Sequence, residues 1–323
     1  MKPNPLAFAL LLGIGLASLS PASAAAQEGG GGPRGRAAEK PVEVKGKLAF
    51  ETFKSASLGR DVPYSIYLPP SYETKTDARY PVVVFLHGLF EDEKRWTAAG
   101  RGVEVLDKLI DEKKIGEMIV AVPDAARGFG FYTNAKNGGE KWEDAIVADF
   151  VPFLDSKYRT VADRKGRALL GCSMGGYGAI KIAFRHPALF SAVAAHSPAL
   201  FPADLEQLPE YAENLINNPK SFLNKPIRQT FGDPIDAQFW KENNPFFIVE
   251  QDKTPKDLKI YFDCGETDRF SFDKGTKALH ELLEKKGVPH ESALRPGSHG
   301  WEFIHDNLPR SFEFIDKAFR SAS

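Results

Sequence analysis

A serine between two glycines offers the clearest chemistry in this chain. It lies in the stretch Gly171-Cys172-Ser173-Met174-Gly175, after a short apolar segment and before a segment of helical character. Gly-x-Ser-x-Gly between a strand and a helix is the pattern of a nucleophile elbow, a sharp turn that exposes the serine hydroxyl above a sheet. We expect both glycines to be sterically required, because a Cβ there would crowd the turn or the neighbouring strand. Ser173 is therefore the candidate nucleophile.

A serine hydroxyl needs a base at neutral pH, and a histidine late in the chain is placed to supply one. His299 lies in the glycine-flanked loop 296–301, directly after the last predicted strand. The carboxyl ends of parallel strands meet at one edge of a sheet, so this loop can reach Ser173. His196, at the end of the strand that follows the serine, and His305, on a predicted helix, stay as alternatives.

The group that orients the histidine is expected between the serine and the histidine along the chain. A predicted strand, 258–263, runs into a loop that contains Asp268, just past the turn. This position is best placed to meet a histidine from the following loop. Asp263, which is still within the strand, and Glu266, which is early in the loop, remain alternatives, because geometry outranks residue type in such a choice.

The oxyanion that develops during acyl transfer needs two backbone N–H donors. One is expected at Met174, which follows the serine at the start of a helix. The other is expected in the loop after an early buried strand, where the chain reads His87-Gly88-Leu89. Leu89 is the predicted donor in that loop.

A sheet must position these loops, and the hydrophobic pattern predicts one. Residues 42–52 and 62–68 alternate apolar and polar side chains, which predicts an antiparallel hairpin at a sheet edge. Further strands are predicted at 81–86, 118–122, 167–172, 190–195, 258–263 and 290–294, and the apolar runs of the first two indicate burial within the sheet. Helices are predicted at 102–114, 144–154, 177–185 and 274–286, and in the final stretch with Phe312, Ile315 and Phe319. This alternation predicts an α/β fold with a mostly parallel sheet and helices on both faces.

The 323 residues are predicted to hold one catalytic domain behind an export signal. Residues 1–26 have the charge, the short apolar run and the small-residue cleavage site of a signal peptide. Residues 27–42 are rich in glycine and proline and are expected to form a flexible linker. The domain then covers 43–323, with a cap-like insertion at 201–256 that is expected to shape the site. We expect a secreted or periplasmic protein without a membrane span after signal removal.

Composition excludes several classes of partner. Lysine and arginine number 42 against 43 aspartate and glutamate, and the two signs are interspersed, so neither nucleic acid nor an anionic membrane is expected. The chain shows no metal-ligand spacing, dinucleotide fingerprint or phosphate loop, so no metal and no cofactor is expected. The expected partner is a small-molecule or carbohydrate-linked ester. Cys172 and Cys264 end separate strands and are predicted to be buried free thiols.

Aromatic side chains indicate the kind of ester. The candidate substrate-binding residues are Phe131, within the aromatic loop 128–132, and Trp142, Trp240 and Trp301. Such rings suit an aromatic or sugar-bearing ester, and packing in the core is the alternative for each of them.

Several motifs together resemble one protein family. The motifs are His87-Gly88-Leu89, Gly171-Cys172-Ser173-Met174-Gly175-Gly176, Cys264-Gly265-Glu266-Thr267-Asp268 and Gly297-Ser298-His299-Gly300-Trp301, supported by segments 64–70 and 239–245. They are similar to those of the esterase D / antigen 85-like family of α/β-hydrolases, which includes feruloyl esterases, enterochelin-type esterases, S-formylglutathione hydrolases and mycolyltransferases. The resemblance covers nearly all of the predicted mature chain.

The resemblance implies an α/β-hydrolase fold with Ser173 as nucleophile, Asp268 as acid and His299 as base. The expected function is that of a secreted serine carboxylesterase acting on small acyl or aromatic esters, feruloyl and acetyl esters of carbohydrates among them. An acyltransferase with the same triad, or a non-catalytic binding module on the same fold, is the alternative.

Overall fold

The structure is a computed structural model that describes residues 44–125 and 130–322. The predicted signal peptide, 1–26, and the whole of the predicted linker, 27–42, together with residues 128 and 129 of the aromatic loop, lie outside the described residues.

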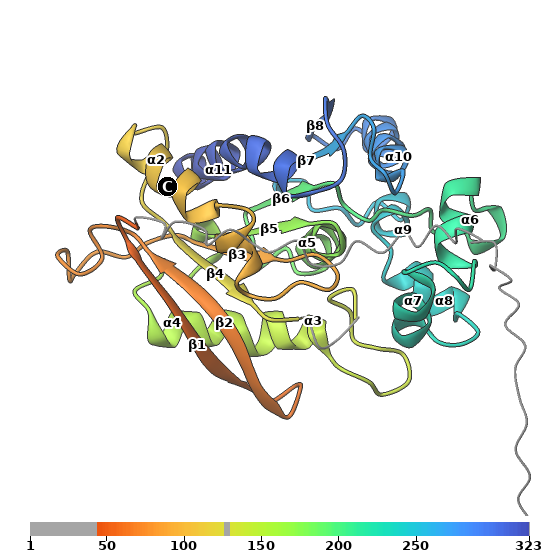
Figure 1. The fold of residues 1–323 in the computed structure, drawn as a ribbon, viewed down its shortest axis with the longest axis horizontal. Helices are drawn as coiled ribbons and strands as arrows, with labels where there is room; N and C mark the ends of the chain where they lie inside the picture. Colours follow the sequence, from red (N-terminus) through yellow and green to blue (C-terminus); the bar gives the residue numbers. More distant parts are fainter. Residues whose placement is uncertain (1–43, 126–129, 323) are drawn as a thin grey trace, which may run out of the picture. The chain divides into compact units, whose positions relative to one another are not determined.

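Within the described residues, eight strands form one sheet in the order β1-β2-β4-β3-β5-β6-β7-β8 (Figure 1). The strands are β1 Lys47–Ser55, β2 Arg60–Leu68, β3 Val82–Leu86, β4 Ile119–Pro123, β5 Arg167–Cys172, β6 Ala192–His196, β7 Lys259–Gly265 and β8 Glu291–Arg295. β1 and β2 form an antiparallel hairpin, β2 pairs antiparallel with β4, and the remaining pairs are parallel. The predicted α/β fold, with its antiparallel edge hairpin, is confirmed.

Helices cover both faces of the sheet. The longer ones are α2 Gly102–Asp111, α4 Val151–Lys157, α5 Met174–Arg185, α10 Phe272–Lys285 and α11 Trp301–Ala322, and the short ones are α1 Arg95–Ala98 and α3 Trp142–Asp144. A π-helical segment, Ala145–Phe150, links α3 to α4, and a 3-10 turn, Arg164–Gly166, precedes β5. The helix predicted at 144–154 is therefore a succession of α, π and α turns.

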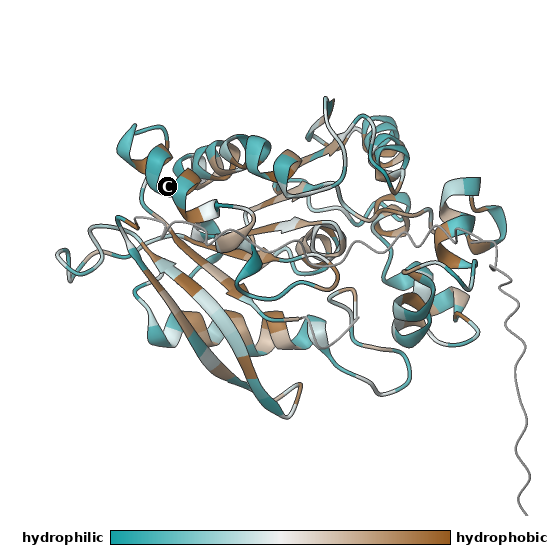
Figure 2. Ribbon diagram, in the orientation of Figure 1, coloured by the Kyte–Doolittle hydropathy of each residue, from teal (hydrophilic) through white to brown (hydrophobic). Residues whose placement is uncertain are grey.

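Alternate side chains of the central strands enter two separate cores. Val84 and Leu86 of β3 belong to the core that also contains residues of α4, α5 and α10, whereas Val83 and Phe85 belong to the core that contains residues of α2 and α11. Figure 2 shows the central strands largely in the brown of apolar residues and the outward faces of the helices largely in teal. A strand buried on both faces needs this continuous apolar run, which is why the sequence pattern identified the sheet.

The interval 201–256 contains four short helices between β6 and β7. They are α6 Glu210–Ile216, α7 Asn224–Phe231, α8 Ala237–Glu242 and α9 Pro245–Glu250, preceded by a 3-10 turn at Leu205–Gln207. Figure 1 shows α6, α7 and α8 grouped to the right of the sheet. Among the described helices, none combines the length and the apolar character that crossing a membrane requires.

Candidate active site

Ser173 stands at the junction of β5 and α5, in the strained backbone conformation of an elbow. Its φ is +54° and its ψ is −120°, outside the regions that L-residues ordinarily adopt. The surrounding backbone holds it there: the Ser173 N–H donates to His196 O over 3.0 Å, and its carbonyl accepts from Tyr177 and Ala199. β5 lies between β3 and β6, so Ser173 follows the carboxyl end of a strand in the middle of the sheet.

The two glycines of the motif are required by close backbone contacts. A Cβ on Gly171 would lie 2.2 Å from the carbonyl oxygen of Gly175. A Cβ on Gly175 would lie 1.9 Å from the carbonyl oxygen of Leu86 in β3. Real Cβ atoms do not approach backbone so closely, so the expected steric role of both glycines is confirmed.

A histidine and an aspartate from two later loops line up with Ser173. The Ser173 Oγ lies 3.1 Å from His299 Nε2, and His299 Nδ1 lies 2.7 Å from Asp268 Oδ2. Since the carboxylate accepts from Nδ1–H, the Nε2 lone pair faces the serine hydroxyl. The rings of Phe270 and Phe272 pack edge-on against the imidazole, with centroids 4.8 and 5.3 Å away, and fix its orientation.

The Asp268 carboxylate is fully buried and held by several donors. Its Oδ1 accepts from the backbone N–H of Phe270 over 2.9 Å, and its Oδ2 lies 3.4 Å from the Cys264 thiol. Burial alone would raise the pKa of the Asp268 carboxyl. The hydrogen bond from His299 and the charge of that imidazole outweigh the burial, so the pKa lies below its usual value. Asp268 is therefore ionised at neutral pH.

The loops after β7 and β8 are bonded to each other, which fixes the distance between aspartate and histidine. Thr267 donates to Gly297 O through both its N–H, over 3.1 Å, and its hydroxyl, over 2.8 Å. The Ser298 hydroxyl donates back to Thr267 O over 2.7 Å. A Cβ on Gly265 would lie 2.5 Å from Gly297 O, so glycine permits this close approach.

A buried histidine shapes the loop after β3. His87 Nδ1 donates to Gly88 O, and His87 Nε2 accepts from the Ala125 N–H, both over 2.8 Å. Burial lowers the pKa of His87, so the ring is neutral and both bonds fit one tautomer. The loop brings Gly88 close to the serine: a Cβ there would lie 3.5 Å from Ser173 Cβ. Leu89 and Ser173 line the same cavity.

Sequence reasoning missed Glu91, which connects the loop after β3 to the start of α11. Its Oε2 accepts from the Gly88 N–H over 2.9 Å, and its Oε1 accepts from Trp301 Nε1 over 2.5 Å. Trp301 is two residues past His299, so one carboxylate ties together the two loops that flank Ser173. With the Gly88 N–H engaged, Leu89 is the better candidate for an oxyanion donor. Met174 begins α5, where N–H groups lack acceptors within the helix.

A cavity of about 480 Å³ opens over Ser173 and His299. This volume is in the range of small-molecule sites. Half of the other lining residues are aromatic or cationic: Phe90, Phe222, Phe270, Trp301, Arg95 and Arg269. Phe222 comes from the 201–256 interval, between α6 and α7. Of these six residues, Trp301 alone is a predicted substrate-binding residue.

The other predicted substrate-binding residues lie in the core. Phe131, Trp142 and Trp240 are each at most 2% exposed, and none of them lines the cavity beside Ser173. Trp142 Nε1 donates to Glu140 over 2.8 Å, and Trp240 packs on Phe231 with centroids 4.8 Å apart. Their positions agree with the alternative interpretation, which is packing in the core. This corrects the expectation that they contact a substrate here.

The alternative acids and bases are placed elsewhere. His196 and Asp263 are fully buried and bond to each other, with Nδ1 and Oδ1 2.7 Å apart. His196 Nε2 lies 3.0 Å from the Ser311 hydroxyl in α11, not from Ser173. His305 bonds to its neighbour Asp306 on α11, and Glu266 is exposed. The two cysteines are buried free thiols on β5 and β7, which β6 separates, so that prediction is confirmed.

Comparisons with known proteins agree with this geometry. The sequence model of a family described as "Putative esterase" matches residues 55–315. The esterase Rv1288 of Mycobacterium tuberculosis is 28% identical over 268 residues, which cover 78% of this chain and 56% of the relative. An endo-1,4-beta-xylanase/feruloyl esterase of Xylanibacter ruminicola is 32% identical over 149 residues, which cover 45% of this chain and 20% of the relative.

Solved structures give the same likeness. A ferulic acid esterase is similar with a TM-score of 0.70 and 28% identity, over 85% of this chain and 99% of its own. The predicted α/β-hydrolase fold is thereby confirmed. This chain spans about half the length of the Mycobacterium tuberculosis relatives, of which 56% is matched.

Proposed function

The chain belongs to this esterase family, and on that premise we propose that it is a secreted serine carboxylesterase with Ser173 as nucleophile. The observation that carries the proposal is the hydrogen-bonded line of Ser173, His299 and Asp268 beside a cavity. Ser173 Oγ lies 3.1 Å from His299 Nε2, and His299 Nδ1 lies 2.7 Å from Asp268 Oδ2. Ser173 and His299 line the cavity. A nucleophile, a base and an orienting carboxylate in this order are what acyl transfer from an ester requires.

In the first half of the proposed reaction, Ser173 Oγ attacks the ester carbonyl while His299 Nε2 accepts its proton. The oxyanion of the tetrahedral intermediate is held by the N–H groups of Leu89 and Met174. When the intermediate collapses, the carbon–oxygen bond to the alcohol breaks and His299 returns the proton to that alcohol. Asp268 stabilises the imidazolium between these two transfers.

In the second half, water attacks the acyl-enzyme and His299 accepts a proton from it. The second tetrahedral intermediate expels Ser173 Oγ, which recovers the proton from His299, and the carboxylic acid leaves. The ester is thus hydrolysed with no cofactor in the balance.

The lining of the cavity supports small acyl and aromatic esters as substrates, with feruloyl and acetyl esters of carbohydrates foremost. Phe222, Phe270 and Trp301 offer flat apolar surfaces for an aromatic acyl group. Arg95 and Arg269, which also line the cavity, can donate hydrogen bonds to hydroxyl or carbonyl oxygens. The names of two relatives, a xylanase/feruloyl esterase and a ferulic acid esterase, favour the same substrate class.

An assay on defined esters tests the proposal. Purified protein is given p-nitrophenyl acyl esters, methyl ferulate and acetylated xylan, with Ser173→Ala as the matched variant. We expect hydrolysis by the wild type and loss of it in the variant. If the two proteins are equally inactive on every ester, the chain is a binding module on a hydrolase fold. If added sugars accept the acyl group faster than water does, it is an acyltransferase.

Export is the part of the proposal that rests on sequence alone. The charge at Lys2, the apolar run 6–19 and the small residues 22–26 support a cleaved signal peptide. Expression of the full chain in a bacterial host, followed by N-terminal sequencing of exported protein, tests it. A new N-terminus between about residues 23 and 28 is expected, and full-length protein retained in the cytoplasm would contradict it.

A further inference from the structure

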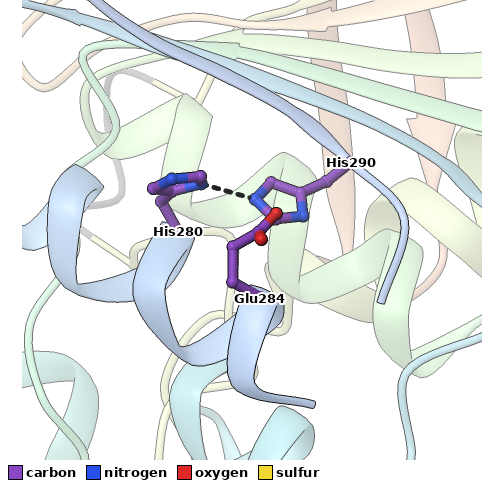
Figure 3. A group of neighbouring side chains, drawn as sticks. All are labelled: His280, Glu284 and His290. Carbon is purple, nitrogen blue, oxygen red and sulfur yellow. Dashed lines mark hydrogen bonds between the residues drawn. The ribbon is translucent and has the colours of Figure 1, made fainter. Parts of the chain in front are cut away.

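Three side chains that can bind a metal ion converge between α10 and β8, away from the cavity. His280 and Glu284 are one turn apart on α10, and His290 immediately precedes β8 (Figure 3). One ligand atom from each lies within 4.8 Å of the other two. His280 Nδ1 and His290 Nε2 are 2.8 Å apart. Residues four apart on a helix share a face, so the fold gives His280 and Glu284 a common direction.

The His290 ring is oriented as a metal ligand would be. Its Nδ1 lies 2.8 Å from Val288 O and donates to it, which leaves the Nε2 lone pair directed at His280. The ring also stacks on Phe262 of β7, with a centroid distance of 5.7 Å and an interplanar angle of 5°. Metal-bound histidines usually donate their other ring N–H to a carbonyl or carboxylate in this way, which fixes the tautomer.

We propose that His280, Glu284 and His290 form a binding site for a divalent transition-metal ion, with zinc as the best match. Two imidazoles and one carboxylate are a donor set that zinc accepts, and a water completes a tetrahedron. Nitrogen ligands of a tetrahedral zinc lie about 3.3 Å apart, so the two rings need to separate by about 0.5 Å. Calcium and magnesium prefer oxygen ligands and are excluded by the two nitrogens.

The proposed metal site would stabilise the folded structure and take no part in ester hydrolysis. His290 precedes the amino end of β8, whereas His299 follows its carboxyl end, so the strand separates the metal from the triad. α10 and β8 are the two elements that connect Asp268 to His299 along the chain. A metal ion bound to both would hold this connection together and stabilise the folded state, because it binds the folded site and not the open chain.

Calorimetric titration of ZnCl₂ into untagged protein stripped with a chelator tests the site. We expect one ion per chain, a higher melting temperature with zinc, and no response to Mg²⁺. The variants His280→Ala and His290→Ala should each weaken binding by about tenfold or more. Glu284→Gln, at an exposed position where misfolding is not a concern, should weaken it as well. Bound Co²⁺ should give the visible absorption of a tetrahedral site.

Two control variants separate this site from other histidines. His305→Ala removes a half-exposed histidine on α11 and should leave zinc affinity unchanged. His299→Ala removes the histidine of the cavity and should also leave the affinity unchanged. The proposal is overturned if the wild-type protein takes up no zinc. It is also overturned if zinc binding survives in His290→Ala and Glu284→Gln but is lost in His299→Ala. In either case the His280–His290 contact is a structural hydrogen bond.

Discussion

Two hydrogen-bonded lines of serine, histidine and aspartate run through the described part of the molecule. In the first, Ser173 Oγ and His299 Nε2 are 3.1 Å apart and His299 Nδ1 and Asp268 Oδ2 are 2.7 Å apart. In the second, the corresponding distances for Ser311, His196 and Asp263 are 3.0 and 2.7 Å. By residue type and distance the two lines are equivalent.

Their surroundings differ completely. The second line is fully buried between the sheet and α11, and the Ser311 hydroxyl can donate to Leu308 O in its own helix over 2.9 Å. Asp263 is shared there with the Tyr261 hydroxyl, 2.6 Å away. Ser173 instead stands on a strained turn beside a cavity and at the start of a helix.

The difference teaches that distance alone does not make a nucleophile. A reacting serine needs space for an ester carbonyl and N–H donors for the oxyanion, in addition to a base. The first line faces a cavity and lies beside the proposed donors at Leu89 and Met174, whereas the second has neither space nor a free direction for its hydroxyl. We infer that the second line joins α11 to β6 and β7 and contributes to stability.

The largest expected effect comes from exchanging the two serines for alanine. Ser173→Ala should lower kcat by roughly 10⁴-fold or more, because the nucleophile is lost. Ser311→Ala should leave kcat within about threefold and lower the free energy of unfolding by about 1–3 kcal/mol, because buried His196 loses a partner. Ester hydrolysis and urea denaturation measure the two effects. Comparable losses of kcat in both variants, at equal folded fractions, would contradict the distinction.

Substitution of the two aspartates should show the same difference as the two serines, with a smaller loss of kcat. Asp268→Asn should lower kcat by about 10³- to 10⁴-fold, because His299 loses the group that fixes its tautomer and stabilises its cation. Asp263→Asn should act on stability, since its hydrogen-bond partners His196 and Tyr261 are buried and do not line the cavity. Kinetics normalised to folded protein, measured by circular dichroism, give the comparison. An active Asp268→Asn enzyme would assign the acid to another carboxylate.

A moderate effect is expected at Glu91, which is found beside the first line and has no counterpart at the second. Glu91→Gln replaces one carboxylate oxygen by an amide nitrogen, so either the Gly88 N–H or Trp301 Nε1 loses its acceptor. We expect kcat to fall about tenfold with KM and stability nearly unchanged, because the loop that carries Leu89 loosens. Steady-state kinetics test this, and an unchanged kcat would remove Glu91 from the positioning of that loop.

The smallest effect is on the pH dependence of stability. The pKa of Asp268 is lower in the folded protein than its usual value, so its ionised form stabilises the fold above the unfolded-state pKa of about 4. This contribution is lost as the pH falls through the folded-state value. Wild-type protein should therefore lose its stability advantage over Asp268→Asn on acidification, as urea titrations between about pH 6 and pH 3 would record. A constant difference over that range would contradict the lowered pKa.

Much of the fold was predictable because each buried strand needs an apolar run and each parallel pair needs a crossover. The elbow at Ser173 was predictable for a similar reason, since glycines at 171 and 175 meet backbone that leaves no room for a Cβ. The loops with Asp268 and His299 were predictable because each comes directly after a predicted strand. That they meet Ser173 required the structure.

What the sequence did not reveal depends on contacts between distant residues. Glu91 and Trp301 are 210 positions apart, and no local pattern predicts their bond. Trp142 and Trp240 resemble substrate-binding residues by type, but periodicity cannot tell a ring that faces a cavity from one that faces the core. The pairing of His280 with His290 likewise needs the turn at Gly287, whose φ is +64°.

Covalent labelling tests the central claim, that Ser173 and not Ser311 is the nucleophile, most directly. A fluorophosphonate reacts with a serine that is activated by a base and faces an oxyanion site. Wild-type protein is labelled in the folded state, digested, and mapped by tandem mass spectrometry. We predict a single adduct on Ser173, blocked in parallel with the loss of esterase activity and absent from Ser173→Ala. An adduct on Ser311, or loss of activity with Ser173 unmodified, would contradict the account.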